Sequence, residues 1–186
     1  YASAPNLVMS TTFVIDPDVA FSANEITADT PFAYTRWGNP TVAQLERKLA
    51  ALEGTEACLA FASGMAAIWA LLARLLAKGD HIVMSDVTYA AASELANDTL
   101  PALGVEVTRI DSSDLDELRS ALRPNTRLLY LETPANPLLR LTDIAAAAEV
   151  AHAAGVPVAV DSTFATPIAL RPVEHGADYV IHSLTK

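Results

Sequence analysis

Short apolar runs alternate with segments of helical periodicity along most of the chain. We expect six buried strands at the runs, which are residues 57–62, 81–85, 105–110, 127–131, 156–160 and 179–182. Strands that are apolar throughout, rather than alternating, are typical of a parallel sheet covered on both faces. The regular alternation of strand and helix therefore predicts an α/β fold with a mostly parallel sheet.

Helical spacing of apolar residues separates these strands. Val42, Leu45, Leu49 and Leu52 mark a first helix, and Gly54 stands where a helix-ending glycine belongs. Further helices are expected at residues 66–77, 90–100, 115–122 and 143–154. Residues 1–40 show little periodicity and are rich in Thr, Pro, Asn and Asp, which predicts an extended arm.

Composition restricts the classes of function. Of 186 residues, 52% are hydrophobic, and 12 Lys and Arg against 22 Asp and Glu give a formal charge of -10. This charge disfavours a nucleic-acid-binding surface. No apolar run reaches the roughly 18 residues of a membrane span, and we expect neither a membrane nor a metal partner. Cys58 is the single cysteine, so no intramolecular disulfide is possible, which suits a cytoplasmic protein.

Polar residues collect where the predicted strands end. Because the carboxyl ends of parallel strands meet at one edge, these residues should lie together. They are Ser63, Gly64, Met65, Tyr89, Glu132, Asn136, Asp161, Ser183, Thr185 and Lys186.

Each of these features also has a simpler explanation when taken alone. Lys186 could be an ordinary solvated lysine, and Asp161 a helix cap or an ion-pair partner. Tyr34 and Arg36, in the arm, form either a surface turn or an anion clamp, because arginine offers a forked donor set to phosphate. Ser63 and Gly64 open a helix, whose free N–H groups attract anions, but they form neither a Walker loop nor a G-x-G-x-x-G turn.

One ligand accounts for all these residues together. A lysine at the mouth of an apolar strand is a candidate neutral amine that condenses with an aldehyde, and a carboxylate pairs a pyridinium nitrogen. With the anion sites for a phosphate, this chemistry describes pyridoxal 5′-phosphate (PLP).

Five spaced motifs also resemble one enzyme family. They are Tyr34-x-Arg36-x-x-Asn39-Pro40-Thr41, Ser63-Gly64-Met65, Glu132-Thr133-Pro134-x-Asn136-Pro137, Asp161-x-Thr163 and Ser183-x-Thr185-Lys186. In this order they resemble the PLP-dependent enzymes of cysteine and methionine metabolism, which include cystathionine γ-synthase, cystathionine γ-lyase, methionine γ-lyase and the homoserine-ester sulfhydrylases.

The resemblance implies a type I PLP-dependent transferase fold and a role for each residue. Lys186 would carry the cofactor covalently as a Schiff base and move protons, Asp161 would pair the ring nitrogen, and Tyr89 would stack on the ring near the leaving group. Glu132, Asn136 and Thr163 would bind the cofactor and shape the site. The phosphate would be held by Ser63, Gly64, Met65, Ser183 and Thr185, and by Tyr34 and Arg36 from a neighbouring subunit.

The resemblance also implies an organisation. We expect an arm at 1–40 that contacts a neighbouring subunit, a PLP-binding large domain at 41–186, and a homodimer at minimum, most simply a homotetramer. We further expect a longer protein, whose smaller C-terminal domain would lie beyond Lys186 and supply the arginine for the substrate carboxylate.

The expected activity is γ-elimination on a methionine- or homoserine-type amino acid, which releases an α-keto acid and ammonia. The alternative within the family is γ-replacement, as in cystathionine γ-synthase or an O-acylhomoserine sulfhydrylase. Ala91 stands where methionine γ-lyases commonly have cysteine, and Ala90, Ser162 and Phe164 also depart from frequent family residues. Alternatives from other classes are a nucleotide-binding oxidoreductase and a PLP-binding module without catalysis.

Overall fold

The computed structural model describes residues 4–16, 18, 22 and 30–186. It contains two compact units. The first comprises Tyr1–Ala51 and Thr55–Ala60, and the large unit comprises Leu52–Gly54 and Phe61–Lys186.

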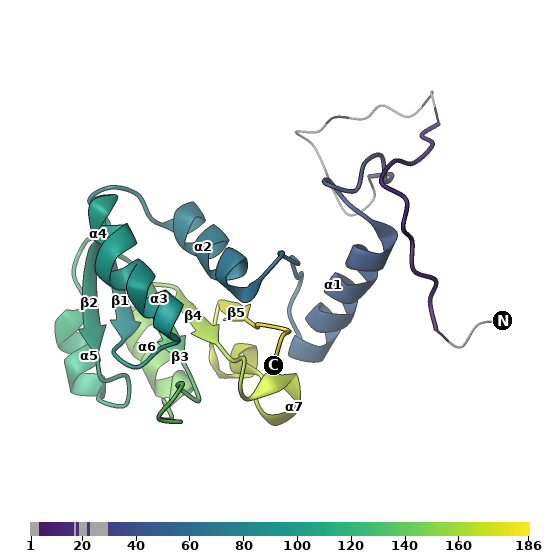
Figure 1. Ribbon diagram of the computed structural model, residues 1–186. Helices are drawn as coiled ribbons and strands as arrows, with labels where there is room; N and C mark the ends of the chain where they lie inside the picture. Colours follow the sequence, from purple (N-terminus) through teal and green to yellow (C-terminus); the bar gives the residue numbers. More distant parts are fainter. Residues whose placement is uncertain (1–3, 17, 19–21, 23–29) are drawn as a thin grey trace. The chain divides into compact units, whose positions relative to one another are not determined.

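A five-stranded parallel sheet forms the centre of the large unit, with strand order β2-β1-β3-β4-β5 (Figure 1). The strands are β1 (His81–Ser85), β2 (Glu106–Ile110), β3 (Thr126–Glu132), β4 (Val158–Asp161) and β5 (Tyr179–Ile181). β1, β3 and β4 are the inner strands, and their side chains are almost all buried, as the apolar runs predicted. The expected α/β fold with a parallel sheet is confirmed.

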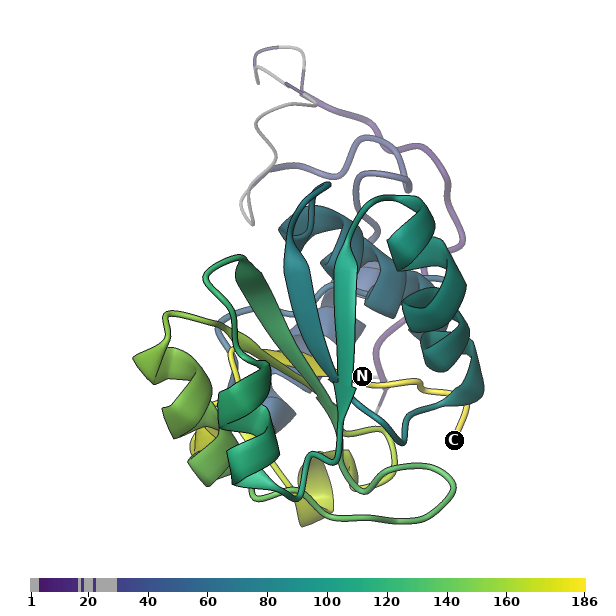
Figure 2. The same cartoon turned by 90° about the vertical axis from the view of Figure 1, so that its left-hand side faces the viewer.

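Helices cover both faces of this sheet (Figure 2). On one face lie α2 (Gly64–Leu75), α3 (Ala90–Glu94), the π-helix η1 (Leu95–Thr99) and α4 (Leu100–Ala102). On the other lie α5 (Leu115–Ala121) and α6 (Ile144–Ala153). The short helices α7 (Thr166–Ala169) and η2 (Pro172–His175) follow β4.

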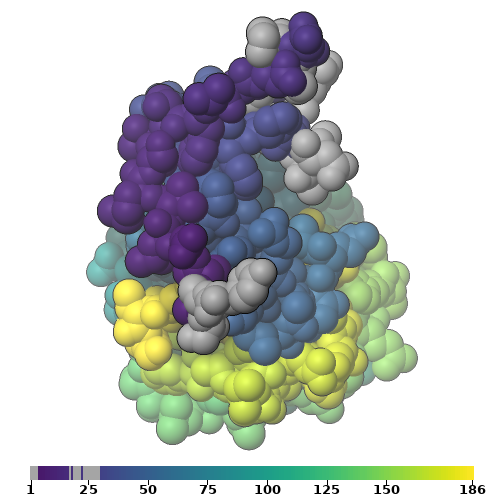
Figure 3. Space-filling model, turned by 90° about the vertical axis from the view of Figure 1, so that its right-hand side faces the viewer, coloured from purple at the N-terminus to yellow at the C-terminus, as the bar shows by residue number. Residues whose placement is uncertain are grey.

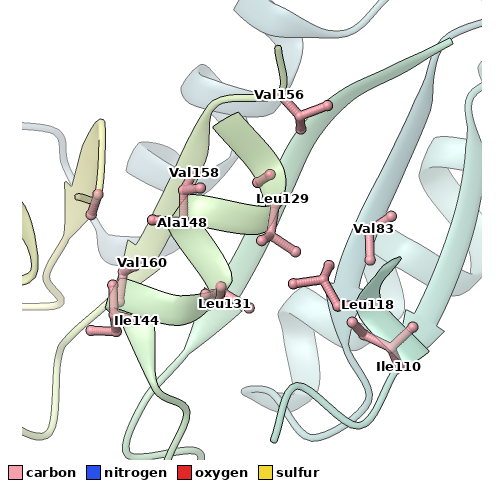
Figure 4. Close-up of a cluster of buried hydrophobic side chains, with 13 residues drawn as sticks. Val83, Ile110, Leu118, Leu129, Leu131, Ile144, Ala148, Val156, Val158 and Val160 are labelled. Atoms are coloured by element: carbon pink, nitrogen blue, oxygen red, sulfur yellow. The ribbon is translucent and has the colours of Figure 1, made fainter. Parts of the chain in front are cut away.

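The two hydrophobic clusters follow the period-two alternation of the strands. Leu129 and Leu131 of β3 pack with Val158 and Val160 of β4 in the cluster under α5 and α6 (Figure 4). Leu128 and Tyr130 of β3 pack instead in the cluster under α2. By the same alternation Glu132, two residues after Tyr130, lies on the α2 side of the sheet.

The helix ends agree with the sequence signals. Ser63, Asp114 and Asp143 cap α2, α5 and α6 by accepting hydrogen bonds from backbone N–H groups of the first turn. The helix expected at 90–100 continues to Ala102 through a π-turn. Pro101 lies just after this turn and has no N–H to donate to the carbonyl four residues earlier.

The first unit holds the arm and α1 (Pro40–Glu53), of which Pro40–Ala51 lies in this unit. Thr12 and Tyr34 form an antiparallel bridge. Asn39, which is 6% exposed, donates hydrogen bonds to the Val8 carbonyl and to Thr35 Oγ1, while its own Oδ1 accepts the Thr41 N–H. Asn39 thus links the arm to the start of α1.

The strand predicted at residues 57–62 is absent, and that prediction is wrong. Leu59 is 74% and Phe61 45% exposed, so the apolar run is not enclosed as a buried strand would be. Its backbone bonds to side chains instead: Ala60 N–H donates to Glu46, and the Ala57 carbonyl accepts from Thr55. Among the described residues, no helix is both long and apolar enough to cross a membrane.

Candidate functional site

A cavity of about 230 Å³ opens at the carboxyl edge of the sheet in the large unit. The start of α2, the ends of β3 and β4, and the segments after β1, β3, β4 and β5 contribute to its wall. Eleven of the residues singled out from the sequence line it, namely Ser63, Gly64, Met65, Tyr89, Glu132, Asn136, Asp161, Thr163, Ser183, Thr185 and Lys186.

Two buried carboxylates form its floor. Glu132 and Asp161 end β3 and β4 and are paired in register, so both reach the cavity from adjacent strands. Asp161 is 7% exposed, and its Oδ1 accepts the Thr163 N–H at 3.0 Å. Its Oδ2 accepts from the Tyr130 hydroxyl at 3.5 Å. Tyr130 is fully buried, and this burial, with the Asp161 charge next, raises the pKa of its phenol well above the usual value.

Glu132 is also buried, at 5% exposure, and contacts two loops. Its Oε2 accepts the Tyr89 N–H at 2.6 Å, and its Oε1 accepts the Asn136 N–H at 2.9 Å. Burial raises the pKa of the Glu132 carboxyl, and the two N–H bonds oppose that rise without cancelling it.

The start of α2 forms the anion-attracting side of the cavity. Ser63 caps the helix through its Oγ, which accepts the Ala66 N–H at 3.1 Å. The first N–H groups of a helix otherwise lack intrahelical partners, and the helix dipole favours negative charge there. The turn after β5 lies against this helix start. Ser183 N–H donates to Thr163 Oγ1 at 2.9 Å, and the Ser183 and Thr185 hydroxyls lie 2.9 Å apart.

Gly64 makes this close approach possible. A Cβ at position 64 would lie 2.8 Å from Ser183 Cβ, closer than side chains pack. Only glycine therefore allows the α2 start and the turn after β5 to form one continuous wall.

Lys186 lines the cavity but is exposed. The residues after β5 lie at the surface of the large unit, where Figure 3 draws the end of the chain in yellow, and Leu184 is 60% exposed. β5 ends at Ile181, so a polar turn separates the strand from the lysine.

Tyr34 and Arg36 belong to the first unit. The Arg36 guanidinium carbon lies 5.1 Å from the Tyr34 ring centroid, and the Trp37 ring packs edge-on against Tyr34 at 6.1 Å. These residues form one cationic and aromatic cluster, and their contact with a phosphate of another subunit stays a prediction.

Sequence reasoning missed several apolar wall residues and one buried support. Ala62 and Ile68 line the cavity but look like ordinary core residues in the sequence, and Pro134 and Phe164, which were noted in the motifs, were given no role in the wall. Tyr130 could have been found from alternation, because a tyrosine two residues before Glu132 must lie on the same face of β3.

The comparisons with known proteins agree with this geometry. A family model described as Cys/Met metabolism PLP-dependent enzyme matches residues 1–186. The chain belongs to this family.

Three relatives illustrate the membership. L-methionine gamma-lyase of Fusobacterium nucleatum subsp. nucleatum is 42% identical over 97% of this chain and 46% of its own length. Canavanine gamma-lyase of Pseudomonas canavaninivorans is 43% identical over 97% of this chain and 45% of its own. The crystal structure of metY from Campylobacter jejuni, which contains N'-pyridoxyl-lysine-5'-monophosphate, superposes with a TM-score of 0.81 at 34% identity. It covers 85% of this chain and 39% of that one.

The chain thus spans about half the length of the curated relatives it matches. The parallel sheet covered on both faces is the type I fold of PLP-dependent Cys/Met enzymes. Family membership also excludes the nucleotide-binding oxidoreductase considered from the sequence.

The cavity fits the family's cofactor. A ring nitrogen needs a carboxylate, which Asp161 offers from a buried position with one oxygen fixed by Thr163. A phosphate needs clustered donors, which the α2 start and the Ser183 and Thr185 hydroxyls supply at the wall that Gly64 keeps open. An aldehyde needs an amine, and Lys186 lines the same cavity.

Proposed function

We propose that the protein to which this chain belongs catalyses PLP-dependent γ-elimination on a methionine- or homoserine-type amino acid, with release of an α-keto acid and ammonia. The observation that carries this proposal is the cavity that brings Asp161, Lys186 and the α2 start together. Two relatives named as γ-lyases, one for methionine and one for canavanine, support elimination at Cγ.

When bound, PLP supplies an electron sink that acidifies the hydrogen on Cα, the carbon bearing the substrate's amino group, and then the hydrogens on Cβ. The Lys186 amine would hold the cofactor aldehyde and, once displaced by the substrate's amino group, take the proton from Cα and then move a proton at Cβ.

The remaining wall residues would bind and orient. Asp161 would pair the ring nitrogen and keep it protonated. Gly64 and Met65, with the Ser63, Ser183 and Thr185 hydroxyls, would hold the phosphate. The Tyr89 ring, 41% exposed, would stack on the cofactor beside the departing γ-group.

We extend the proposal to the assembly. Arg36, beside Tyr34, would reach the phosphate of a neighbouring subunit, so the active protein would be a homodimer at minimum and most simply a homotetramer. The single cysteine and the charge of -10 support a cytoplasmic enzyme.

The test uses the full-length protein and its Lys186→Ala variant. The wild type should release keto acid and ammonia and, after borohydride reduction, carry a pyridoxyl mass on the peptide containing Lys186. The variant should show neither. A variant that keeps the reducible adduct would overturn the assignment, and a wild type with the adduct but no turnover would indicate a binding module without catalysis.

A second assay separates elimination from replacement, which is the alternative function. Methionine, cystathionine, O-acylhomoserines and canavanine are compared for keto-acid release with and without an added thiol. Keto acid without thiol supports the lyase. A new thioether formed only with thiol supports replacement.

A further inference from the structure

Both carboxylate oxygens of Glu132 accept main-chain N–H groups, one from each of two separate loops. One bond holds Tyr89 in the segment after β1, and the other holds Asn136 in the segment after β3. The side chains of both recipients line the cavity. Glu132 thus joins two parts of the wall through their backbones.

The two hydrogen bonds explain how the Glu132 carboxylate can be buried. An ionised group at 5% exposure is costly unless it is hydrogen-bonded, and charge-assisted bonds to N–H groups are short and strong. The bonds at 2.6 and 2.9 Å satisfy both Glu132 oxygens without any ligand.

We propose that Glu132 is a positioning residue rather than a cofactor ligand: it clamps the loops after β1 and β3 so that Tyr89 and Asn136 face the bound ligand. The identity of that ligand rests on the proposed function. The clamp itself rests only on the hydrogen bonds within this chain.

The clamp requires a side chain at position 132 that only accepts hydrogen bonds and does not donate them. A carboxylate accepts at both oxygens, whereas the amide of Gln has one oxygen and one NH₂. In Glu132→Gln the side chain keeps its shape, but in either orientation its NH₂ faces the N–H of Tyr89 or of Asn136. One clamp bond must therefore be lost and replaced by a donor facing a donor.

Glu117→Gln is the matched control. Glu117 is exposed, and its Oε2 accepts a single backbone N–H, that of Asp111, at 3.0 Å. The Gln oxygen can keep this bond, so the same chemical change leaves the backbone partner satisfied.

The first test is hydrogen–deuterium exchange of the full-length protein without added PLP, resolved to single amides. In the wild type the Tyr89 and Asn136 amides should be protected. Glu132→Gln should speed exchange in at least one of them by about tenfold to hundredfold, the size expected for losing a bond to a charged acceptor. Glu117→Gln should leave both unchanged. Unprotected Tyr89 and Asn136 amides in the wild type would overturn the clamp, and so would unchanged exchange in Glu132→Gln. The wild-type measurement tests the clamp even if the variant does not fold.

The second test asks whether the clamp acts through Tyr89. PLP affinity is titrated by absorbance, and Glu132→Gln should weaken it by about tenfold, one hydrogen bond's worth. In a Tyr89→Ala background the same change should have a smaller effect, because the ring it positions is gone. Equal losses in both backgrounds would refute positioning through Tyr89. A wild type that binds no PLP would refute the proposed function while leaving the exchange result to decide the clamp.

Discussion

Gly64→Ala tests how closely the helix start and the turn after β5 approach each other. The added Cβ would lie 2.8 Å from Ser183 Cβ, 3.1 Å from its Oγ and 3.2 Å from its Cα. Carbon atoms pack best at about 3.5–4.0 Å, so the methyl group overlaps its neighbour by about 0.7 Å or more. Since one of the atoms met is backbone, a rotamer change of Ser183 cannot relieve the overlap.

Two opposing effects set the size of the change. Replacing a glycine by alanine at a compatible backbone conformation stabilises by about 0.4–1 kcal/mol through the unfolded state. Overpacking typically costs about 1–3 kcal/mol. The net expectation is a loss of unfolding free energy on the order of 1 kcal/mol, together with weaker PLP binding as the α2 start moves from the Ser183 turn.

The assay is urea denaturation of the full-length protein without cofactor, followed by PLP titration of the folded variant. Adding Ser183→Gly removes the two side-chain atoms that the new methyl group meets, Cβ and Oγ, and leaves only the Cα at 3.2 Å. It should therefore restore most of the lost stability, though not the hydroxyl. A Gly64→Ala protein as stable as the wild type and equal in PLP affinity would refute the close approach on which the cavity wall depends.

Two further predictions concern stability. His81 is fully buried between the Thr126 and Thr108 hydroxyls, and burial, with the Arg123 charge next, lowers its pKa below the usual 6.5. The unfolded chain then binds the proton that the folded chain excludes, so unfolding free energy should fall as pH drops below about 6.5, by no more than about 1.4 kcal/mol per pH unit. His81→Gln should show a shallower fall in denaturation at pH 7.5 and 5.5, and an unchanged slope would contradict this account. Leu129→Ala, at a fully buried position of β3, should cost about 2–5 kcal/mol, whereas Leu139→Ala, 60% exposed, should stay within about 0.5 kcal/mol in the same measurement.

The sequence predicted the sheet well wherever an apolar run was also enclosed. The run at 81–85 became β1 with the expected ends, because its residues are buried by helices on both faces. The run at 57–62 has the same apolar character, yet it lies exposed outside the sheet. The hydrophobicity of a segment shows that it can be buried, but not which other part of the protein will cover it. No local pattern therefore distinguishes residues 57–62 from residues 81–85.

The residue types that give the site its chemistry could be predicted from the sequence, but the hydrogen bonds that hold them in place could not. Asp161 and Glu132 stood out because carboxylates rarely end apolar strands. The backbone partners of Glu132 could not be foreseen, since they depend on how the loops after β1 and β3 fold back. Lys186 was recognisable by its motif, and it lines the cavity with Ser183 and Thr185 of the same motif.

The wall of the cavity draws on both ends of the large unit, from Ser63 at the start of α2 to Lys186 after β5. Asp161 and Glu132 can take their places on the sheet without β5, but the side facing the α2 start exists only once β5 and the turn after it have joined. During synthesis, therefore, a nascent chain that ends before β5 and the turn after it cannot present this set of groups, and cofactor capture must wait until both have joined the sheet.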